Sequence, residues 1–242
     1  MYNREKYIIR LINSIRSQNF KDLEIIFIDD SSNDNSCHII EKVQKKDENI
    51  ILIKNKKNRG TFISRNLGVL ISKGEYLIVP DSDDILSENI IDISYYLAKK
   101  YDFEIIRYNI YLGNKNIFLL APFNKFENRP IYQPELSTYL FYGSGKLKYV
   151  DFNISNKFIK REAFIKALNY INKYYLTLYM LIYEDGLMNF ILYRTVKSMY
   201  FKKKIGYYYI KNASSISISN SHQISETQIL KFIFIYYFII LL

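Results

Sequence analysis

The chain has 242 residues, which is enough to bury a full hydrophobic core, and its single cysteine excludes a fold held together by internal disulfides. Lysine and arginine outnumber aspartate and glutamate by 34 to 24, so the net charge of +10 favours anionic partners such as phosphorylated ligands or anionic lipid surfaces. No zinc-finger spacing, basic heptad repeat or aromatic RNA-binding consensus accompanies this charge, so we do not expect a nucleic-acid-binding protein.

The first 110 residues alternate helix-like and strand-like segments at short intervals. Apolar residues recur at helical spacing after Asn3, and further helix-like segments begin near residues 36, 61 and 87. Short apolar runs at residues 23–28, 50–53, 76–79 and 103–108 have the length of strands. This alternation predicts a parallel sheet with helices on its faces, in which Asn3 and Ser87 cap two of the helices.

The second half of the chain is less regular. We expect helices near residues 161–168 and 185–194 and tyrosine-rich strands near residues 199–210. Residues 232–242 are continuously apolar but fall short of the roughly 20 residues that span a bilayer. They fit a buried terminal helix or strand, a monotopic membrane contact, or part of a longer apolar segment.

Two acidic clusters directly follow strand-like runs. Asp29 and Asp30 follow the first run, and Asp81 and Asp83 follow the third. Ligands of open α/β sheets bind at the carboxyl ends of strands, so both clusters should face one crevice. Asp29 and Asp30 also suit a local turn or helix cap. Because the second cluster accompanies them, we favour carboxylates that accept hydrogen bonds from a nucleotide base or ribose.

Asp81, Asp83 and Asp84 lie close together in sequence, so their negative charges repel one another strongly. Mg²⁺ or Mn²⁺ prefers such oxygen ligands and takes one or two carboxylates, with water and substrate phosphates as its other ligands. A solvated acidic turn would explain an isolated Asp-x-Asp pair. The position directly after an apolar run that ends at Pro80 favours a divalent cation held by Asp81 and Asp83.

Glu184 and Asp185 begin a third acidic site, just before a helix-like apolar pattern. An acidic first turn that complements the helix dipole explains this placement, and the spacing alone favours that explanation. A carboxylate here could also act as the general base that deprotonates an acceptor hydroxyl. Arg65 and the basic residues 54–59 could compensate phosphates, although a basic surface loop is the more frequent meaning of such a run.

Several motifs occur in a fixed order along the chain. They are Tyr2-Asn3, Ile28-Asp29-Asp30-Ser31-Ser32-Asn33-Asp34, Asn58-Arg59-Gly60, Ser64-Arg65-Asn66-Leu67-Gly68, Lys73-Gly74-Glu75-Tyr76, Asp81-Ser82-Asp83-Asp84, Asn156-Lys157-Phe158 and Glu184-Asp185. In this order and spacing the chain resembles the family 2 glycosyltransferases of the GT-A fold, densely over residues 2–110 and more thinly beyond. The resemblance implies an α/β fold with a Rossmann-like, mostly parallel central sheet and helices on both faces.

The resemblance also implies an inverting, metal-dependent enzyme. It would transfer a sugar from a nucleoside-diphosphate sugar, with a UDP-sugar expected, to a glycan or lipid-linked acceptor in surface polysaccharide or lipopolysaccharide-type biosynthesis. Mg²⁺ or Mn²⁺ would be the cofactor. The implied roles are base contact for Asp30 with Asp29 beside it, donor contact for Tyr2, ribose and metal–diphosphate binding for Asp81 and Asp83, a place near the donor phosphates for Arg65, and the general base for Asp185.

The chain departs from this family at its start, because the family's first strand is missing before Tyr2-Asn3, which would expose the edges of neighbouring strands. We expect a donor-binding half over residues 1–110, an acceptor-binding half with the catalytic base over residues 111–225, and an apolar segment over residues 226–242. The lone cysteine and polar start predict a cytoplasmic chain, with peripheral contact at the inner face of the cell membrane.

Two other functions stay open. A sugar nucleotidyltransferase also uses metal-binding carboxylates on an α/β sheet, but it needs a glycine-rich loop with Arg or Lys near its first strand, and none is visible. A non-catalytic remnant that binds nucleotide sugar would fit the missing strand.

Overall fold

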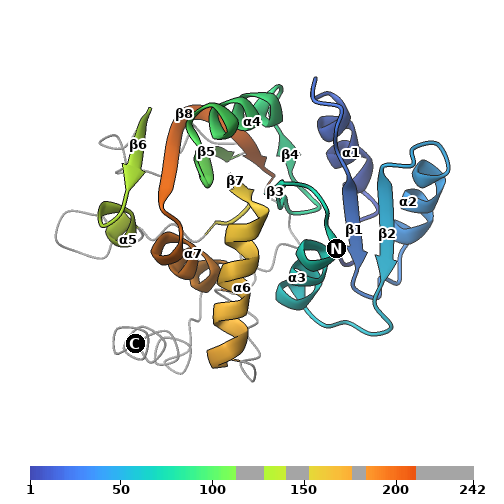
Figure 1. Ribbon diagram of the computed structural model, residues 1–242. Helices are drawn as coiled ribbons and strands as arrows, with labels where there is room; N and C mark the ends of the chain where they lie inside the picture. The colour runs from blue at the N-terminus through green and yellow to red at the C-terminus, as the bar shows by residue number, and fades with distance from the viewer. Residues whose placement is uncertain (113–127, 140–152, 176–183, 211–242) are drawn as a thin grey trace. The chain divides into compact units, whose positions relative to one another are not determined.

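The computed structural model describes residues 1–112, 128–139, 153–175 and 184–210, which belong to one compact unit, Met1–Ile210 (Figure 1). The apolar segment at residues 226–242 lies outside the described residues. The helices are α1 Ile8–Arg16, α2 Ser36–Gln44, α3 Thr61–Ile71, α4 Ile90–Tyr101, α5 Glu135–Tyr139, α6 Arg161–Tyr175 and α7 Glu184–Thr195. The strands are β1 Ile25–Asp29, β2 Ile50–Lys54, β3 Tyr76–Ile78, β4 Ile85–Leu86, β5 Ile105–Leu112, β6 Arg129–Tyr132, β7 Lys157–Lys160 and β8 Ser198–Tyr209.

The predicted alternation of helices and strands in the first half is confirmed, but the two predicted helix caps are wrong. Asn3 has a left-handed backbone with φ 51°, and its Oδ1 accepts a hydrogen bond from Asn33 N at 2.9 Å. Ser87 Oγ donates to Ile205 O at 2.8 Å. Both α1 and α4 begin further along the chain. These polar side chains therefore make long-range contacts instead of capping the nearest helix.

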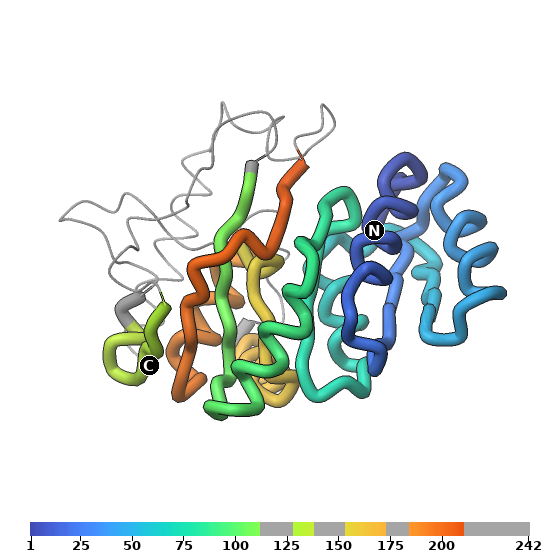
Figure 2. The backbone as a smooth tube through the Cα atoms, turned by 90° about the horizontal axis from the view of Figure 1, so that it is seen from above, coloured from blue at the N-terminus to red at the C-terminus, as the bar shows by residue number. Residues whose placement is uncertain are grey.

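The strands form two sheets. β1 and β2 pair in parallel. The larger sheet has the order β3-β7-β5-β8-β4, and β6 also pairs with β8. β5 and β8 run side by side in parallel (Figure 2), whereas the β3–β7, β5–β7, β4–β8 and β6–β8 pairs are antiparallel. It follows that β3, β5 and β8 point in the same direction within a mixed sheet.

Helices cover both faces of the larger sheet. Ile106 and Phe158 face each other across the β5–β7 pair and join the hydrophobic core to which α1, α2 and α4 contribute. Their neighbours Ile105 and Ile159 are also buried and point to the opposite face, because side chains alternate along a strand. Figure 1 shows α6 and α7 on that side. Because helices cover both faces, a ligand-binding site is expected in the loops at the strand ends.

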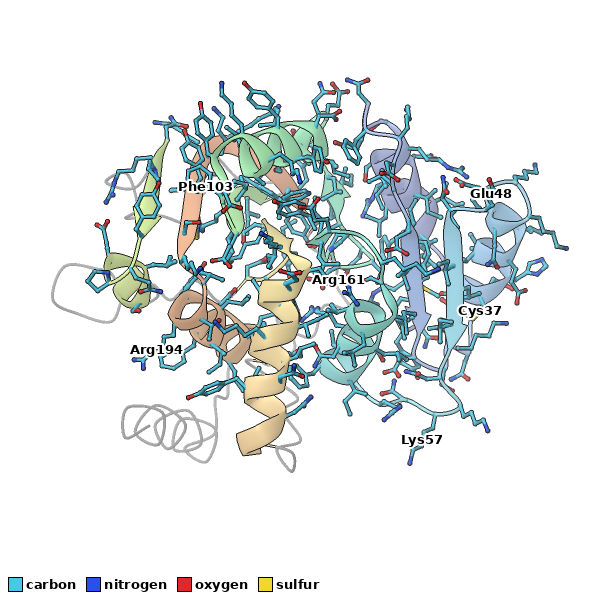
Figure 3. All side chains as sticks on the ribbon, viewed as in Figure 1. Cys37, Glu48, Lys57, Phe103, Arg161 and Arg194 are labelled. Atoms are coloured by element: carbon cyan, nitrogen blue, oxygen red, sulfur yellow. The ribbon has the colours of Figure 1, made fainter. Side chains whose placement is uncertain are left out.

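Contacts between α3 and α6 tie the β1–β2 region to this second face. Arg161, at the start of α6, donates from Nε to Ser72 Oγ at 3.1 Å (Figure 3). Its backbone N–H also donates to Glu75 O at 2.8 Å, just before β3. The position of α3 is therefore fixed against the larger sheet, which matters because α3 carries Arg65.

Met1 binds the backbone of β1 at the edge away from β2. Met1 N donates to Ile28 O at 2.7 Å, and Asp30 N donates to Met1 O at 2.8 Å. These two bonds are the pattern by which Met1 pairs with Asp29 in a parallel ladder. Burial lowers the pKa of the Met1 amino group. In the described part of the chain, no strand pairing joins β1 and β2 to the larger sheet.

We predict that an apolar extension of about five residues before Met1, the length of a typical strand, stabilises the fold. It replaces a buried ammonium by an amide that keeps the bond to Ile28, and it lets the pairing continue along β1. A gain of about 1 kcal/mol raises the melting temperature by about 2–4 °C in a chain of this size. Thermal unfolding followed by circular dichroism measures it.

A Gly-Ser extension of equal length is the control, because it supplies the amide but forms strands poorly. If both extended chains melt at the temperature of the original chain, the edge of β1 does not accept a strand.

Candidate active site

Three segments bring charged side chains together around one arginine. Asp81 lies in the loop between β3 and β4, Asp185 lies in the first turn of α7, and Arg65 projects from α3. Arg65 Nη1 donates to Asp185 Oδ1, and Nη2 donates to Asp81 Oδ1 at 3.3 Å. The arginine side chain is 10% exposed. One buried guanidinium therefore joins the predicted metal-binding loop to the predicted general base.

Burial and neighbouring charges raise the pKa of two carboxylates in this cluster. Burial raises the pKa of Asp81, Arg65 opposes the rise, and Asp185 and Asp83 reinforce it. Burial also raises the pKa of Glu184 to about 7, and the neighbouring Asp185 adds to that rise. Burial is the main cause of both rises, so a further cation or a proton would relieve the cost of holding these carboxylates ionised.

Asp83 is held from the side of α1. Arg4 Nε lies 3.8 Å from Asp83 Oδ2, and Arg10 Nη2 donates to the backbone oxygen of Asp83 at 2.5 Å. Both predicted metal ligands therefore have an arginine beside them, Arg65 at Asp81 and Arg4 at Asp83. Sequence reasoning assigned no role to Arg4 or Arg10, since their approach depends on the packing of α1 against β4.

The oxygen ligands of Asp81 and Asp83 fit Mg²⁺ or Mn²⁺. Their side chains are 39% and 17% exposed and offer the carboxylate oxygens that a divalent cation prefers. No group of three or more His, Cys, Asp or Glu side chains with metal-binding geometry occurs in the described ranges. A cation at Asp81 and Asp83 would therefore take its remaining ligands from water and substrate phosphates, as Mg²⁺ usually does.

Asp84 fastens this loop to the end of β8. Tyr207 Oη donates to Asp84 Oδ2, and Ile210 N donates to Asp84 Oδ1 at 2.8 Å. Asp81 N in turn donates to Tyr207 Oη at 3.2 Å. Burial raises the pKa of Asp84 to about 7. Sequence reasoning counted Asp84 among the acidic residues but missed this anchoring contact, because the tyrosine lies more than a hundred residues away.

Asp30 anchors the loop after β2. Its Oδ1 accepts hydrogen bonds from Asn55 Nδ2 and Arg59 N, both at 2.8 Å, and its Oδ2 accepts one from Gly60 N at 2.8 Å. Gly60 has φ 85°, a backbone conformation that glycine adopts readily. Burial alone would raise the pKa of Asp30, but these hydrogen bonds lower it overall. Asp30 is therefore a buried, ionised carboxylate that holds the loop after β2 in place.

Asp29 and Tyr2 complete the group at the end of β1. Asp29 Oδ2 accepts a hydrogen bond from Ser32 N at 3.1 Å, while its buried Oδ1 has no hydrogen-bond partner among the described residues. Tyr2 is 43% exposed and follows Met1, whose amino group interacts with Asp29, Asp30 and Asp81. The two predicted acidic clusters thus face one region, and their contact with a donor stays a prediction.

Comparison with known proteins identifies relatives of the chain. A family model described as glycosyl transferase family 2 matches residues 1–168. The chain is 32% identical over 111 residues to glycosyltransferase GlyG of Streptococcus pneumoniae serotype 4, covering 46% of this chain and 37% of that protein. It is 31% identical over 173 residues to cholesterol galactosyltransferase of Borreliella burgdorferi, covering 68% and 47%.

A third relative is the UDP-Glc:alpha-D-GlcNAc-diphosphoundecaprenol beta-1,3-glucosyltransferase WfaP of Escherichia coli, 43% identical over 83 residues, with 34% of this chain and 32% of that protein covered. The chain therefore spans less than half the length of each of these three relatives.

Solved structures with the same architecture include S. aureus TarS 1–349 in complex with UDP, at a TM-score of 0.67 and 21% identity. That match covers 88% of this chain and 59% of TarS 1–349. The mannosyltransferase PcManGT from Pyrobaculum calidifontis, in complex with GDP-Man and Mn²⁺, matches at a TM-score of 0.62 and 11% identity, covering 91% and 57%. The expected GT-A fold is thereby confirmed.

Replacing Asp30 with asparagine should destabilise the chain at neutral pH. An amide nitrogen cannot accept the bonds that the loop backbone donates, and leaving such buried groups unpaired costs about 1–3 kcal/mol. Because the pKa of Asp30 is lowered in the folded state, its ionised form stabilises the fold above the unfolded-state pKa. That stabilisation is lost as the pH falls through the folded-state pKa.

Urea unfolding at several pH values tests this prediction. The free-energy difference between the original chain and Asp30→Asn should be largest near neutral pH and should shrink in acid. Asp22→Asn, at an exposed carboxylate, is the matched control. A difference that does not change with pH would show that the charge of Asp30 contributes nothing to stability.

Proposed function

The chain belongs to glycosyl transferase family 2, and from this premise we propose that it transfers a sugar from a UDP-sugar, with inversion, to a glycan or lipid-linked acceptor. The observation that supports the proposal most is the Arg65 bridge between Asp81 and Asp185. An inverting transfer needs a group that receives the leaving diphosphate and a base that activates the acceptor, and both must lie close to one sugar carbon. Arg65 joins a candidate for each role, with Asp81 on the side of the diphosphate and Asp185 as the base.

The relatives support a UDP-sugar as donor. WfaP carries a UDP-Glc-dependent activity in its name, and TarS was solved in complex with UDP and with UDP-GlcNAc. In this chain we assign Asp29, Asp30 and Tyr2, at the end of β1, to the base and ribose of the donor. The donor phosphates would then lie toward Asp81 and Arg65.

We assign Asp81 and Asp83 to hold Mg²⁺ or Mn²⁺, and PcManGT, solved with Mn²⁺, supports this choice. Such a cation neutralises charge on the leaving diphosphate. The chain supplies carboxylate oxygens on a loop that Asp84 ties to Tyr207 and Ile210. Fixing the loop in advance reduces the reorganisation needed when the donor binds.

Asp185 is our candidate for the general base. The acceptor hydroxyl would give its proton to the Asp185 carboxylate as its oxygen forms a bond to the anomeric carbon. The bond from that carbon to the diphosphate oxygen breaks at the same time, and its electron pair leaves with UDP. Attack opposite the leaving group inverts the configuration at the anomeric carbon.

A lipid-linked acceptor and a cytoplasmic place at the inner face of the membrane are further parts of the proposal. WfaP is named for a diphosphoundecaprenol-linked acceptor, and the Borreliella burgdorferi relative is named for cholesterol. We therefore favour surface polysaccharide or lipopolysaccharide-type biosynthesis, with residues 111–225 facing the acceptor. Over the ranges that the structure describes, none of the helices is long and apolar enough to cross a membrane.

A panel of UDP-sugars with Mn²⁺ tests the catalytic proposal by release of UDP. We expect metal-dependent release with one donor, and we expect Asp185→Asn to lower kcat by about 10²–10⁴-fold, the usual contribution of a general base. Asp83→Asn should raise the Mn²⁺ concentration needed for half-maximal rate. Asp22→Asn should behave like the original chain.

Release that persists in EDTA would contradict the metal assignment. A product that keeps the anomeric configuration of the donor, seen by NMR, would contradict inversion. If no UDP-sugar reacts but UDP binds, the chain is a non-catalytic nucleotide-binding protein.

A further inference from the structure

Each of the two carboxylates assigned to the metal has a guanidinium beside it. Arg65 Nη2 lies 3.3 Å from Asp81 Oδ1, and Arg4 Nε lies 3.8 Å from Asp83 Oδ2. A guanidinium uses the same negative charge and the same oxygen lone pairs as a metal ion. Arg65 differs from Arg4 because its other terminal nitrogen donates to Asp185.

We propose that Arg65 is a positioning residue that competes with the divalent cation for Asp81 and thereby couples loading of the donor site to the orientation of Asp185. The inference rests on the proposed function. Without a cation, Arg65 bridges Asp81 and Asp185. Once Asp81 serves as a metal ligand, Arg65 keeps Asp185 as its partner and holds that carboxylate toward the acceptor.

The two ends of the bridge are not equivalent. The Asp185 side chain is 23% exposed, whereas the Asp81 side chain is 39% exposed. Arg65 itself is only 10% exposed. A cation from solvent can therefore reach Asp81 more easily than Asp185. Asp81 is the partner that exchanges, and Asp185 is the partner that Arg65 retains.

The charges of the three side chains also favour release of Asp81, and not of Asp185, by Arg65 when a cation binds. One guanidinium with two carboxylates carries a net negative charge, whereas the neighbouring Asp83 has Arg4 beside it. A divalent cation at Asp81 offsets this net negative charge, while Arg65 still has Asp185 to compensate its buried charge. If Asp185 were absent, Asp81 would be the main compensating carboxylate for Arg65, with Glu184 as a weaker one, and a buried charge without a partner is strongly destabilising.

Arginine is suited to this role where lysine is not. Its planar fork donates from separate nitrogens, so it reaches two carboxylates at once, whereas an ammonium group is a compact point charge. A lysine at position 65 could compensate one carboxylate at a time. Coupling between Asp81 and Asp185 should therefore be lost in Arg65→Lys even though the charge is kept.

A purely structural ion pair makes the opposite prediction. If Arg65 only held the loop after β3 in place, removing it would weaken metal binding or leave it unchanged. If Arg65 competes with the cation, removing it strengthens metal binding. The sign of the change in Mn²⁺ affinity therefore separates the two roles, independently of catalysis.

The experiment titrates Mn²⁺ alone into the full chain and follows the free ion by EPR. We expect Arg65→Gln to bind Mn²⁺ about three- to tenfold more tightly, a modest effect because Asp81 is partly screened by solvent. Arg16→Gln is the matched control. It removes the same charge from an arginine that pairs with Asp47 at 2.7 Å, and it should change the Mn²⁺ affinity less than twofold, in line with a screened surface pair.

A second pair of variants keeps the test decisive if Arg65→Gln folds poorly. Asp185→Asn should weaken Mn²⁺ binding, because Arg65 then depends more strongly on Asp81. Arg65→Gln combined with Asp185→Asn removes the guanidinium together with the Asp185 carboxylate that it contacts, and it should bind Mn²⁺ more tightly than Asp185→Asn alone. The gain on removing Arg65 should be larger in this background than in the original chain.

Kinetics test the positioning half of the inference. In Arg65→Gln the Mn²⁺ concentration for half-maximal rate should fall while kcat also falls, a combination that general loss of structure does not give. Affinity that is unchanged or weaker on removing Arg65 in both backgrounds overturns the inference and leaves the proposed function standing. Absence of Mn²⁺ binding by the original chain overturns the metal assignment and the inference together.

Discussion

Arg65 reaches from α3 to Asp81 and Asp185, which lie 16 and 120 residues further along the chain. A guanidinium that is 10% exposed is stable only if carboxylates meet it, so α3, the loop after β3 and the first turn of α7 must pack around one point. The shared contacts of Arg65 therefore hold the loop after β3 against the start of α7. The candidate active site exists because this one charge is buried and shared.

The rest of the site is built by carboxylates that hold loops rather than face solvent. Asp30 accepts hydrogen bonds from Asn55, Arg59 and Gly60 in the loop after β2. Asp84 accepts hydrogen bonds from Tyr207 and Ile210 at the end of β8. Each anchor lies directly after or close to a strand, where the backbone is already fixed by the sheet. Asp81 and Asp83 are thus presented by a loop that is held in place from both sides.

Much of this arrangement could be predicted from the sequence, because helical and strand periodicities are local signals and the acidic residues follow strand-like runs. Periodicity does not give strand order, so the insertion of β7 between β3 and β5 was not foreseen. Local sequence predicts helix caps at Asn3 and Ser87, but both side chains make hydrogen bonds to residues far away in the sequence instead. The Arg65 bridge and the Asp84–Tyr207 contact join residues whose proximity only the folded chain reveals.

Calorimetric titration of UDP into the original chain and into Asp81→Asn, with Mn²⁺ and then with EDTA, tests whether Asp81 and a divalent cation organise the donor site. We expect UDP binding to depend on Mn²⁺ and Asp81→Asn to weaken it about tenfold or more, which corresponds to about 1.4 kcal/mol. UDP binding of equal strength in EDTA, or unchanged by Asp81→Asn, would contradict a donor site organised by Asp81 and a divalent cation.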